Sequence, residues 1–339
     1  MPALLAVLLL LAVGVVGCGK GGLKVGLAYA AGGPGDHGFN DSALAGLNRA
    51  RAQFGGSIST VRALTARANE TEDDQYQRLS LLCEAGYNPV IAVGFTYAGA
   101  DPATGPLARA AKECPDTHFA IVDDESVRQP NVANLVFADQ QGSYLMGIVA
   151  ASKSTTNIIG FVGACQVPVI DRFLAGYQAG ARSIKPDIAI RTGYVSTDPQ
   201  MCDFTDVAAG KSVAAGLYAD GADVVFQAAG GAGVGVFEAA AAAGKHAIGV
   251  DEDQYNTVDA ALRPVILTSM VKRVDVAVYD FIASVVAGHF KAGVRRYDLA
   301  DSGLSYATTG GAIDDLVPAL REAQKKIIAG TIDVPSTPS

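Results

Sequence analysis

The stretch that decides the fold reads Ala30-Ala31-Gly32-Gly33-Pro34-Gly35-Asp36-His37-Gly38-Phe39-Asn40-Asp41-Ser42. An apolar run at 24–30 precedes it, as expected of a buried strand, and a helical pattern of apolar residues follows at 42–54. Loops between a strand and a helix are where open α/β sheets bind their ligands. Asp36, Phe39 and Asn40 place a carboxylate, a flat apolar ring and an amide in this loop. We therefore expect it to form one wall of a binding cleft; the alternative is a loop that only turns the chain.

The same loop contains a partial match to a cofactor motif. Gly33, Gly35 and Gly38 spell G-x-G-x-x-G, the fingerprint of dinucleotide-binding loops. However, Pro34 has no N–H to offer, and Asp36 would repel a pyrophosphate. The next expected strand, at 58–64, also lacks a following acidic residue that could hold a ribose. The sequence therefore predicts no nicotinamide cofactor, and we expect no cofactor of any kind.

Length and composition indicate two α/β lobes. The chain has 339 residues, enough for two lobes with their own cores, and a net charge of −8 without a basic stripe, which argues against nucleic acid as a partner. Apolar strand-like runs alternate with alanine-rich helical patterns, first over 24–138 and again from 140 onward. We expect two doubly wound parallel-sheet lobes with a hinge and a ligand cleft between them, a favoured position for small-molecule sites.

The alternation also predicts the boundaries of the lobes. We expect the N-terminal lobe to comprise residues 24–138 and 255–301, and the C-terminal lobe residues 139–254 and 302–332. The chain would then cross between the lobes near Ala138, Gln254 and Ser302. Residues 333–339 are rich in Pro, Ser and Thr and are predicted to be a disordered tail.

The N-terminus has a separate character. Residues 4–16 are an uncharged apolar run too short to cross a bilayer comfortably, and it runs into Val15-Val16-Gly17-Cys18, which resembles a bacterial lipobox. In this interpretation residues 1–18 are a lipoprotein signal peptide, Cys18 is lipidated, and 19–23 form a tether. The mature protein would be lipid-anchored on the extracytoplasmic face of the cell membrane. No Lys or Arg precedes the run, which departs from signal peptides and leaves an ordinary core segment as the alternative.

Four cysteines remain if Cys18 carries a lipid. Cys83 and Cys114 both fall late in expected helices of the first lobe, whereas Cys165 and Cys202 both follow expected strands of the second. We propose the pairs 83–114 and 165–202 for an oxidising compartment. Four cysteines allow three connectivities, and buried free thiols are the alternative.

Several long motifs occur along nearly the whole expected mature chain. They are Gly32-Gly33-Pro34-Gly35-Asp36 with Phe39-Asn40-Asp41, Val93-Gly94-Phe95, Asn131-Val132-Ala133, Gly160-Phe161-Val162-Gly163 with Arg172-Phe173-Leu174-Ala175-Gly176-Tyr177, Gly221-Ala222-Asp223-Val224-Val225-Phe226-Gln227-Ala228-Ala229-Gly230-Gly231, Ile248-Gly249-Val250-Asp251-Glu252-Asp253-Gln254, and Thr268-Ser269-Met270-Val271-Lys272-Arg273-Val274-Asp275. On these motifs the chain resembles the basic membrane protein family of bacterial ABC-transporter substrate-binding lipoproteins, of the purine nucleoside receptor type. The resemblance implies a type I periplasmic-binding-protein fold, a monomer, a purine nucleoside ligand, and ABC permease and ATPase subunits as partners.

The resemblance also implies roles for single residues. Phe39 and Phe204 would stack on the two faces of the base, while Asn40 and Asp123 would contact its edge. Ala30 stands where members of this type often carry an aspartate.

The remaining site residues follow from the same resemblance. Asp251 and Lys272 would bind the ribose hydroxyls, with a backbone N–H of Gly231 nearby, and Asp36 and Phe95 complete the expected ligand-binding set. A carboxylate that accepts from two hydroxyls and a lysine that donates to them suit a sugar ring.

Two other functions are possible. A protein of the same fold that binds a sugar or a signal molecule is the main alternative, because the three phenylalanines could also stack on a sugar face. A nucleoside-processing enzyme would need a nucleophile–base pair, a metal cluster or a complete cofactor fingerprint. The chain has no G-x-S-x-G elbow, and His37, His118, His246 and His289 are scattered without metal-ligand spacing. The sequence therefore predicts a solute-binding protein without a metal site, not an enzyme.

Overall fold

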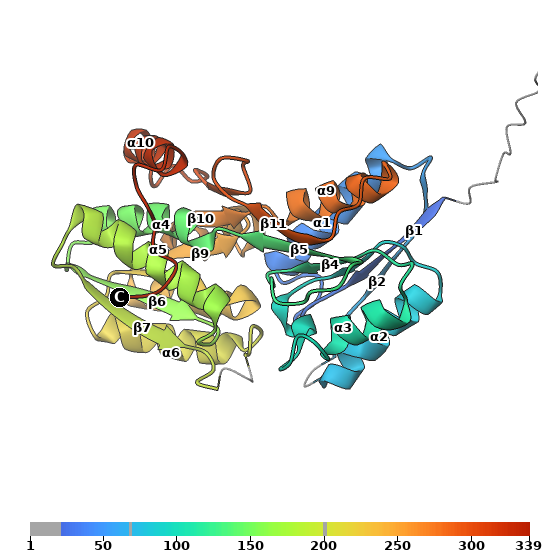
Figure 1. Ribbon diagram of the computed structural model, residues 1–339. Coiled ribbons are helices and arrows are strands. Elements are labelled where there is room, and N and C mark those ends of the chain that lie inside the picture. The colour runs from blue at the N-terminus through green and yellow to red at the C-terminus, as the bar shows by residue number, and fades with distance from the viewer. Residues whose placement is uncertain (1–21, 68–69, 199–201) are drawn as a thin grey trace, which may run out of the picture.

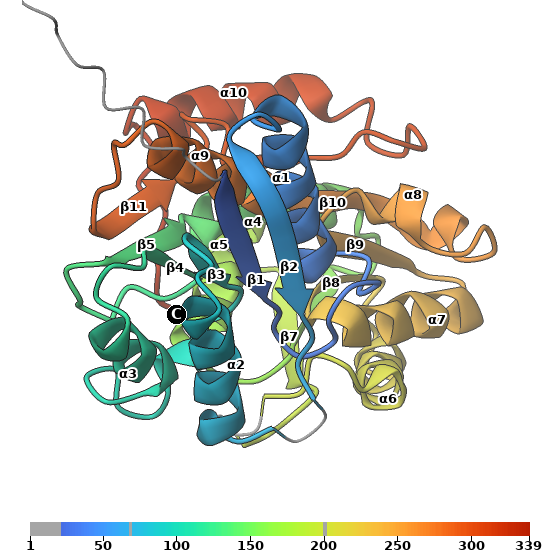
Figure 2. The same cartoon turned by 90° about the vertical axis from the view of Figure 1, so that its right-hand side faces the viewer.

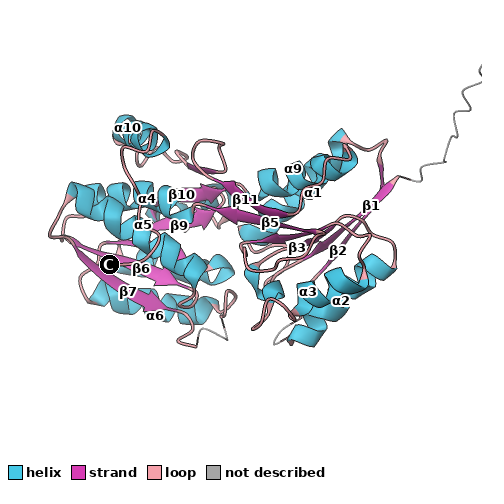
Figure 3. Cartoon of the chain, viewed as in Figure 1, coloured by secondary structure: helices cyan, strands magenta, loops and turns pink. Residues whose placement is uncertain are grey.

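The computed structural model describes residues 22–67, 70–198 and 202–339. Two α/β lobes lie side by side, each built on a six-stranded sheet (Figure 1). In each lobe helices cover both faces of the strands (Figure 3). The expected pair of doubly wound lobes is therefore confirmed.

The first lobe has a fully parallel sheet in the order β11-β5-β4-β3-β1-β2, seen from left to right in Figure 2. Its strands are β1 (Leu23–Ala28), β2 (Ile58–Leu64), β3 (Val90–Ala92), β4 (Phe119–Val122), β5 (Val132–Phe137) and β11 (Gly293–Tyr297). The central strands β3, β4 and β5 are buried along their whole length, which explains why all their residues except Asn134 are apolar. One face is covered by α1 (Phe39–Gln53) and α9 (Val274–Val286), the other by α2 (Glu72–Glu84) and α3 (Pro106–Glu113) (Figure 1).

The second lobe repeats this plan in the order β12-β10-β9-β8-β6-β7. Its strands are β6 (Ile158–Gly163), β7 (Ala189–Tyr194), β8 (Val224–Ala228), β9 (His246–Asp251), β10 (Ile266–Lys272) and β12 (Leu304–Tyr306), the last antiparallel to β10. Two packed helix pairs accompany the sheet, α4 (Asp139–Lys153) with α5 (Pro168–Ile184), and α6 (Val207–Ala219) with α7 (Gly233–Ala243). Shorter helices are η1 (Phe95–Ala98) in the first lobe and η2 (Gly230–Ala232), α8 (Gln254–Thr257) and η3 (Arg263–Val265) in the second, and α10 (Val317–Ile328) lies against α4.

The strand order reverses at the first strand of each lobe. β1 lies between β2 and β3, and β6 lies between β7 and β8. In open α/β sheets the crevice at such a reversal, at the carboxyl ends of the strands, is the usual ligand position. The topology therefore predicts a ligand site at the loops that follow the strands on either side of the gap between the lobes.

The chain changes lobes at Ala138, at Arg273 and within residues 298–303. The expected crossing near Gln254 is wrong, because β10 pairs with β9 and β12 and so belongs to the second sheet. The second segment of the first lobe is therefore residues 274–297, and not the expected 255–301. The edge strands β11 and β12 are additions that the sequence analysis did not predict.

Both expected terminal segments need correction. Residues 333–339 are not a disordered tail: Val334 is buried, and the backbone N–H of Ser339 donates to Oε1 of Gln178 on α5 at 3.0 Å. Leu23, expected in the tether, is the first residue of β1, and its N–H donates to the carbonyl of Ser57 at 2.7 Å. The expected signal peptide, with Cys18, lies outside the described residues. None of the helices that are described is long and apolar enough to cross a membrane.

Two disulfides join the cysteine pairs that were proposed. Cys83 near the end of α2 is bonded to Cys114 at the end of α3, with their Cα atoms 6.3 Å apart. Cys165, just after β6, is bonded to Cys202, which precedes α6, with a Cα separation of 5.1 Å. The first bond lies within the first lobe, and the second lies at the gap between the lobes.

Candidate ligand-binding cleft

A cavity of about 780 Å³, including the part that opens to solvent, lies between the two lobes. Its lining comes from loops after β1, β3 and β4 of the first lobe and from the ends of β8, β9 and β10 of the second. All nine residues of the expected ligand-binding set are in this lining: Asp36, Phe39, Asn40, Phe95, Asp123, Phe204, Gly231, Asp251 and Lys272. Its volume lies within the range of small-molecule sites.

Asp36 organises the glycine-rich loop. Its Oδ1 accepts from the backbone N–H groups of Gly38 and Asp41 at 3.1 and 3.2 Å, and its Oδ2 accepts from that of Asn40 at 2.8 Å. These bonds satisfy N–H groups of the first helical turn, which explains why α1 begins at Phe39 and not at 42 as expected. Burial raises the pKa of Asp36, and the same hydrogen bonds oppose that rise.

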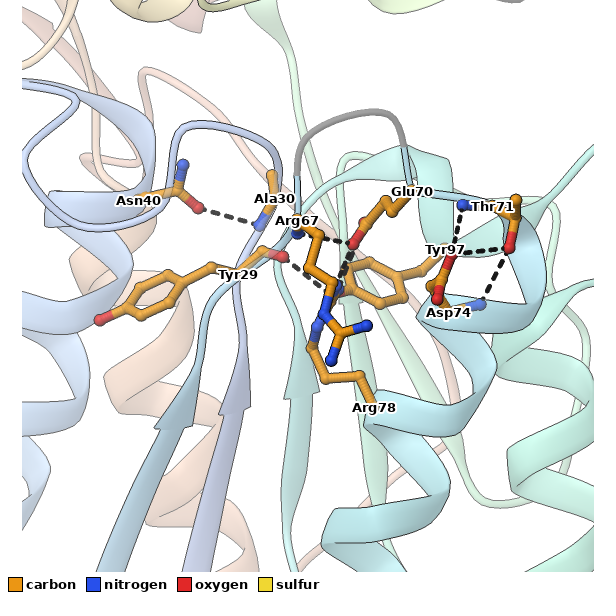
Figure 4. A network of polar contacts seen from close by, with 9 residues as sticks. All are labelled: Tyr29, Ala30, Asn40, Arg67, Glu70, Thr71, Asp74, Arg78 and Tyr97. Carbon is orange, nitrogen blue, oxygen red and sulfur yellow. Dashed lines mark hydrogen bonds and ion pairs between the residues drawn. The ribbon is translucent and has the colours of Figure 1, made fainter.

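Asn40 is also used by the loop. Its side chain is buried, and Oδ1 accepts from the N–H of Ala30 at 3.0 Å (Figure 4). Its Nδ2 donates to Oδ2 of Asp36 at 2.9 Å and to the carbonyl of Ala31 at 3.3 Å. Both N–H bonds of this amide are thus engaged with the loop, so Asn40 holds the wall of the cavity in shape.

A buried polar network supports this wall from behind (Figure 4). The hydroxyl of Tyr97 donates to the carbonyl of Tyr29 at 2.7 Å and accepts from Arg78, whose guanidinium also pairs with Glu70. Arg78 and Glu70 have side chains only 7% and 9% exposed. Burial raises the pKa of Tyr97, so the hydroxyl keeps its proton and remains a donor. The network ties the end of β1 to η1, which carries Phe95.

Aromatic rings line the cavity from both lobes. Phe39 and Phe95 come from the first lobe, and Phe173 and Phe204 come from the second. Phe95 and Phe204 meet edge to face, with ring centroids 6.2 Å apart. A Cβ on Gly230 would lie 3.3 Å from the side chain of Phe204, so this glycine lets the ring approach η2. Phe204 of the second lobe thus meets Phe95 of the first lobe across the gap.

Lys272 is the buried cation of the site, with a side chain 2% exposed. Its Nζ lies 2.7 Å from Oδ2 of Asp123 and 3.0 Å from Oδ1 of Asp139, so it joins the two lobes. It also lies 4.9 Å from the ring centroid of Phe137. Burial lowers the pKa of Lys272, whereas the negative charges of Asp123, Asp139 and Asp251 raise it. The charges have the larger combined effect, so the pKa of Lys272 is raised overall. Lys272 is the last residue of β10.

Asp123 and Asp251 occupy equivalent places in the two lobes. Asp123 follows the fourth strand of the first lobe and Asp251 ends the fourth strand of the second, with φ angles of +66° and +67°. This left-handed conformation is uncommon for residues other than glycine and often marks functional sites. Oδ1 of Asp123 is buried without a hydrogen-bond partner among the described residues. Both carboxyl groups are available to hydroxyl or N–H donors of a ligand.

Asp251 has a strongly raised pKa. Burial raises its pKa to about 8, Lys272 lowers it, and Asp36, Asp123 and Asp139 raise it. Its carboxyl group makes no hydrogen bond within the described part of the chain. A ligand hydroxyl can therefore either donate to this group or, when it is protonated, accept from it.

Asp139 and Arg172 were missed by the sequence analysis. Asp139 is fully buried at the start of α4, and its Oδ2 lies 3.3 Å from Nε of Arg172 on α5. The signal was a carboxylate directly after the apolar run of β5 and an arginine within one of the quoted motifs. Asp139 pairs with Lys272, and Arg172 pairs with Asp139 in turn. No group of three or more His, Cys, Asp or Glu side chains in the described ranges is arranged to hold a metal.

Comparison with known proteins decides the family. A family model described as "ABC transporter substrate-binding protein PnrA-like" matches residues 24–338. The chain belongs to this family. As a PnrA-like substrate-binding protein, it is 34% identical over 337 residues to the "ABC transporter nucleoside-binding protein BmpA" of Lactococcus lactis subsp. cremoris, covering 95% of this chain and 92% of the relative. It is 32% identical over 311 residues to "Basic membrane protein A" of Borreliella burgdorferi, covering 89% and 84%.

Solved structures agree with this assignment. An ABC transporter solute-binding protein from Aeropyrum pernix K1 superposes with a TM-score of 0.77 at 26% identity and covers 94% of both chains. A second, from Conexibacter woesei, has a TM-score of 0.71 at 22% identity over 93% of this chain and 99% of that chain, and shows the fold alone. This PnrA-like protein is thus an ABC transporter substrate-binding protein with a type I periplasmic-binding-protein fold. The resemblance drawn from the motifs is confirmed.

Proposed function

We propose that the protein binds a purine nucleoside between its lobes and delivers it to an ABC importer. The observation that carries this proposal is a cavity that both lobes line with phenylalanine rings and that has a charged end, where Lys272 pairs with Asp123 and Asp139 beside the ring of Phe39. A nucleoside offers the same two kinds of surface, since a flat base is joined to a polyol. The name of the Lactococcus relative, which states nucleoside binding, supports the ligand class.

The base would lie among the aromatic rings. Phe39 and Phe204 would face its two sides with Phe95 beside Phe204, and base–aromatic stacking contributes about 1–3 kcal/mol per base. Oδ1 of Asp123 would accept from an N–H on the edge of the base, since it lacks a partner among the described residues. Asn40 and Asp36 would shape the loop that the edge meets, because their polar atoms already bond within it.

The ribose would lie at the charged end. Asp251 would bond to its hydroxyls and Lys272 would donate to them, with the backbone of Gly231 nearby. Of the described residues that line the cavity, three are acidic and Lys272 alone is basic. A phosphate group would meet a net negative charge there, so we infer a preference for nucleosides over nucleotides.

We also infer where the protein acts. The segment before Cys18 would be removed as a signal peptide, and Cys18 would be the lipid anchor on the extracytoplasmic face of the membrane. The protein would act as a monomer with a permease and an ATPase, without a cofactor, and would not be an enzyme. Mass spectrometry of the membrane-extracted protein tests this: the mature chain should begin at Cys18 and carry a diacylglycerol on the thiol of that residue, and an unmodified Cys18 would contradict it.

The ligand is tested by thermal and chemical unfolding with guanosine, inosine, adenosine, cytidine, uridine, ribose and galactose. A ligand at a hundredfold excess over its dissociation constant should stabilise the protein by about 2.7 kcal/mol. We expect purine nucleosides to do so and ribose alone not to. Stabilisation by galactose or ribose only would favour the sugar-binding alternative, and release of free base from inosine would reveal an enzyme.

A single substitution tests the ribose contact. Asp251→Ala should abolish nucleoside binding and change the binding of free bases little, because only the sugar would reach this carboxyl group. Asp187→Ala, at an exposed aspartate away from the cleft, is the control. Unchanged nucleoside affinity in Asp251→Ala would refute the assignment.

A further inference from the structure

The Cys165–Cys202 disulfide lies at the wall of the cavity. Cys165 is fully buried, directly beyond the end of β6, which is an interior strand of the second sheet. Cys202 is half-buried and lines the cavity itself. The bond therefore attaches a cavity-lining segment to the end of a buried interior strand.

The attached segment carries Phe204, two residues after Cys202. Its backbone carbonyl accepts from the N–H of Ala232 at 2.9 Å. Oδ1 of Asp203 accepts from the N–H and the hydroxyl of Thr205, both at 2.7 Å, which closes a local turn around the phenylalanine. Phe204 is thus held by a covalent bond before it, a turn around it and one hydrogen bond to η2.

The same segment is where the second lobe meets the first. The ring of Phe204 contacts Phe95, and a Cβ on Gly32 would lie 3.6 Å from Cγ2 of Thr205. Gly32 belongs to the glycine-rich loop that forms the opposite wall. The placement of this short segment therefore sets how the two walls of the cavity face each other.

We propose that the Cys165–Cys202 disulfide is a positioning element of the ligand site, which holds Phe204 ready to stack. This inference rests on the proposed function. A ring that is already in place loses little conformational freedom when the ligand arrives, whereas a ring on a loose segment must be ordered at that moment. The disulfide thus contributes to affinity and not only to stability.

The other disulfide is a natural control. Cys83–Cys114 joins two helices of the first lobe, and neither cysteine lines the cavity. The two bonds close loops of similar length, with sequence separations of 31 and 37 residues, so both should restrict the unfolded chain to a similar degree. Each pair also combines a buried cysteine, Cys165 or Cys83, with a half-buried one, Cys202 or Cys114.

The experiment compares Cys202→Ala with Cys114→Ala, so that the buried cysteine of each pair stays in place. Guanosine affinity is measured by calorimetry and stability by urea unfolding. We expect both variants to lose stability, but only Cys202→Ala to bind guanosine about tenfold more weakly, as loss of one stacking contact would. Equal affinity of Cys202→Ala and wild type, or an equal loss in both variants, overturns the proposal.

A double-mutant cycle separates positioning from general loosening. In a Phe204→Ala background the ring is absent, so Cys202→Ala should change guanosine affinity by less than about twofold. The same tenfold loss with and without Phe204 would overturn the role assigned to the disulfide. If Cys202→Ala does not fold, wild type is reduced with a phosphine, its free thiols are counted, and the same affinity loss is expected.

Guanosine binding by the wild type distinguishes a failure of the proposed function from a failure of the role assigned to the Cys165–Cys202 disulfide. Wild type that binds no nucleoside overturns the proposed function, and this inference with it. Wild type that binds guanosine normally, beside a Cys202→Ala variant that does the same, overturns only the inference.

Discussion

Asp251 shows at the scale of one residue how burial couples the site to pH. Its pKa is raised to about 8 in the folded protein from an ordinary value of 3.8. Between these values the folded state keeps a proton that the unfolded chain has released. The free energy of unfolding therefore falls as pH rises, by about 1.4 kcal/mol per pH unit from this group.

The corresponding prediction concerns Asp251→Asn, which mimics the protonated acid. We expect it to match wild type in stability at pH 5 and to exceed it at pH 7, because the amide cannot lose a proton. Urea unfolding at both pH values measures the difference. Asp187→Asn at the surface is the control, and the same pH slope in Asp251→Asn and wild type would contradict the assignment.

Tyr97 allows a second prediction at the residue scale. Tyr97→Phe removes the donor to the carbonyl of Tyr29 and an acceptor for Arg78, both buried, and should cost about 1–3 kcal/mol of stability. Tyr177 is the matched control, since its hydroxyl is buried without a hydrogen-bond partner in the described part of the chain. Urea unfolding should find Tyr177→Phe neutral or slightly stabilised; equal effects of the two changes would show that the network does not stabilise the wall.

At the scale of elements, the close packing of α4 and α5 supports the charged end of the cleft. A Cβ on Gly176 would lie 2.0 Å from the carbonyl oxygen of Gln140, and one on Gly180 would lie 1.9 Å from that of Tyr144. Only glycine allows the helices to come this close. Their approach is what brings Arg172 of α5 to Asp139 of α4, and Asp139 in turn to Lys272.

Gly176→Ala should therefore destabilise the protein by about 1–3 kcal/mol, because the helices must separate. Gly216→Ala is the control on α6, where an added Cβ meets nothing within 4 Å and should stabilise by about 0.4–1 kcal/mol. Chemical unfolding measures both. A stabilising Gly176→Ala would show that the interface is looser than described.

The strands show how far sequence patterns reach. β3 and β4 are apolar throughout and β5 is apolar apart from Asn134, so these strands and the polar loops at their ends were predicted, because burial leaves a local pattern in the sequence. β11 was missed because it is a short edge strand with two arginines, Arg295 and Arg296. The lobe that holds β10 was predicted wrongly because the choice of a pairing partner has no local periodicity.

The candidate site, like the strands, could be predicted only where the sequence carries a local signal. The nine lining residues could be predicted from the family resemblance, which reaches Asp123 and Phe204 although the quoted motifs do not contain them, but the contacts of these residues could not be predicted. Asp139 reaches Lys272, and Phe95 reaches Phe204, only after distant segments fold together. The ordered end at 333–339 was missed for the same reason, because its burial against α5 depends on tertiary packing and not on its own composition.

At the scale of the whole molecule, a ligand that bridges the lobes should protect both walls together. In hydrogen exchange, nucleoside should slow exchange in residues 30–41 of the first lobe and in 202–206 of the second, because closure stabilises both. The edge strand β7, whose centre is exposed, should not change and is the internal control. Protection limited to one lobe would contradict binding by closure.

The position of Lys272 has a mechanical consequence. Lys272 and Asp139 each stand next to a residue at which the chain changes lobes, Arg273 and Ala138, whereas Phe95 and Phe204 are remote in sequence from all three crossings. When one lobe rotates about a hinge, residues close to the hinge move least and residues far from it move most. The Lys272–Asp139 pair, which lies within the second lobe beside two crossings, therefore stays assembled when the lobes turn, while Phe95 and Phe204 separate. An arriving solute meets this polar pair before the two rings close over it.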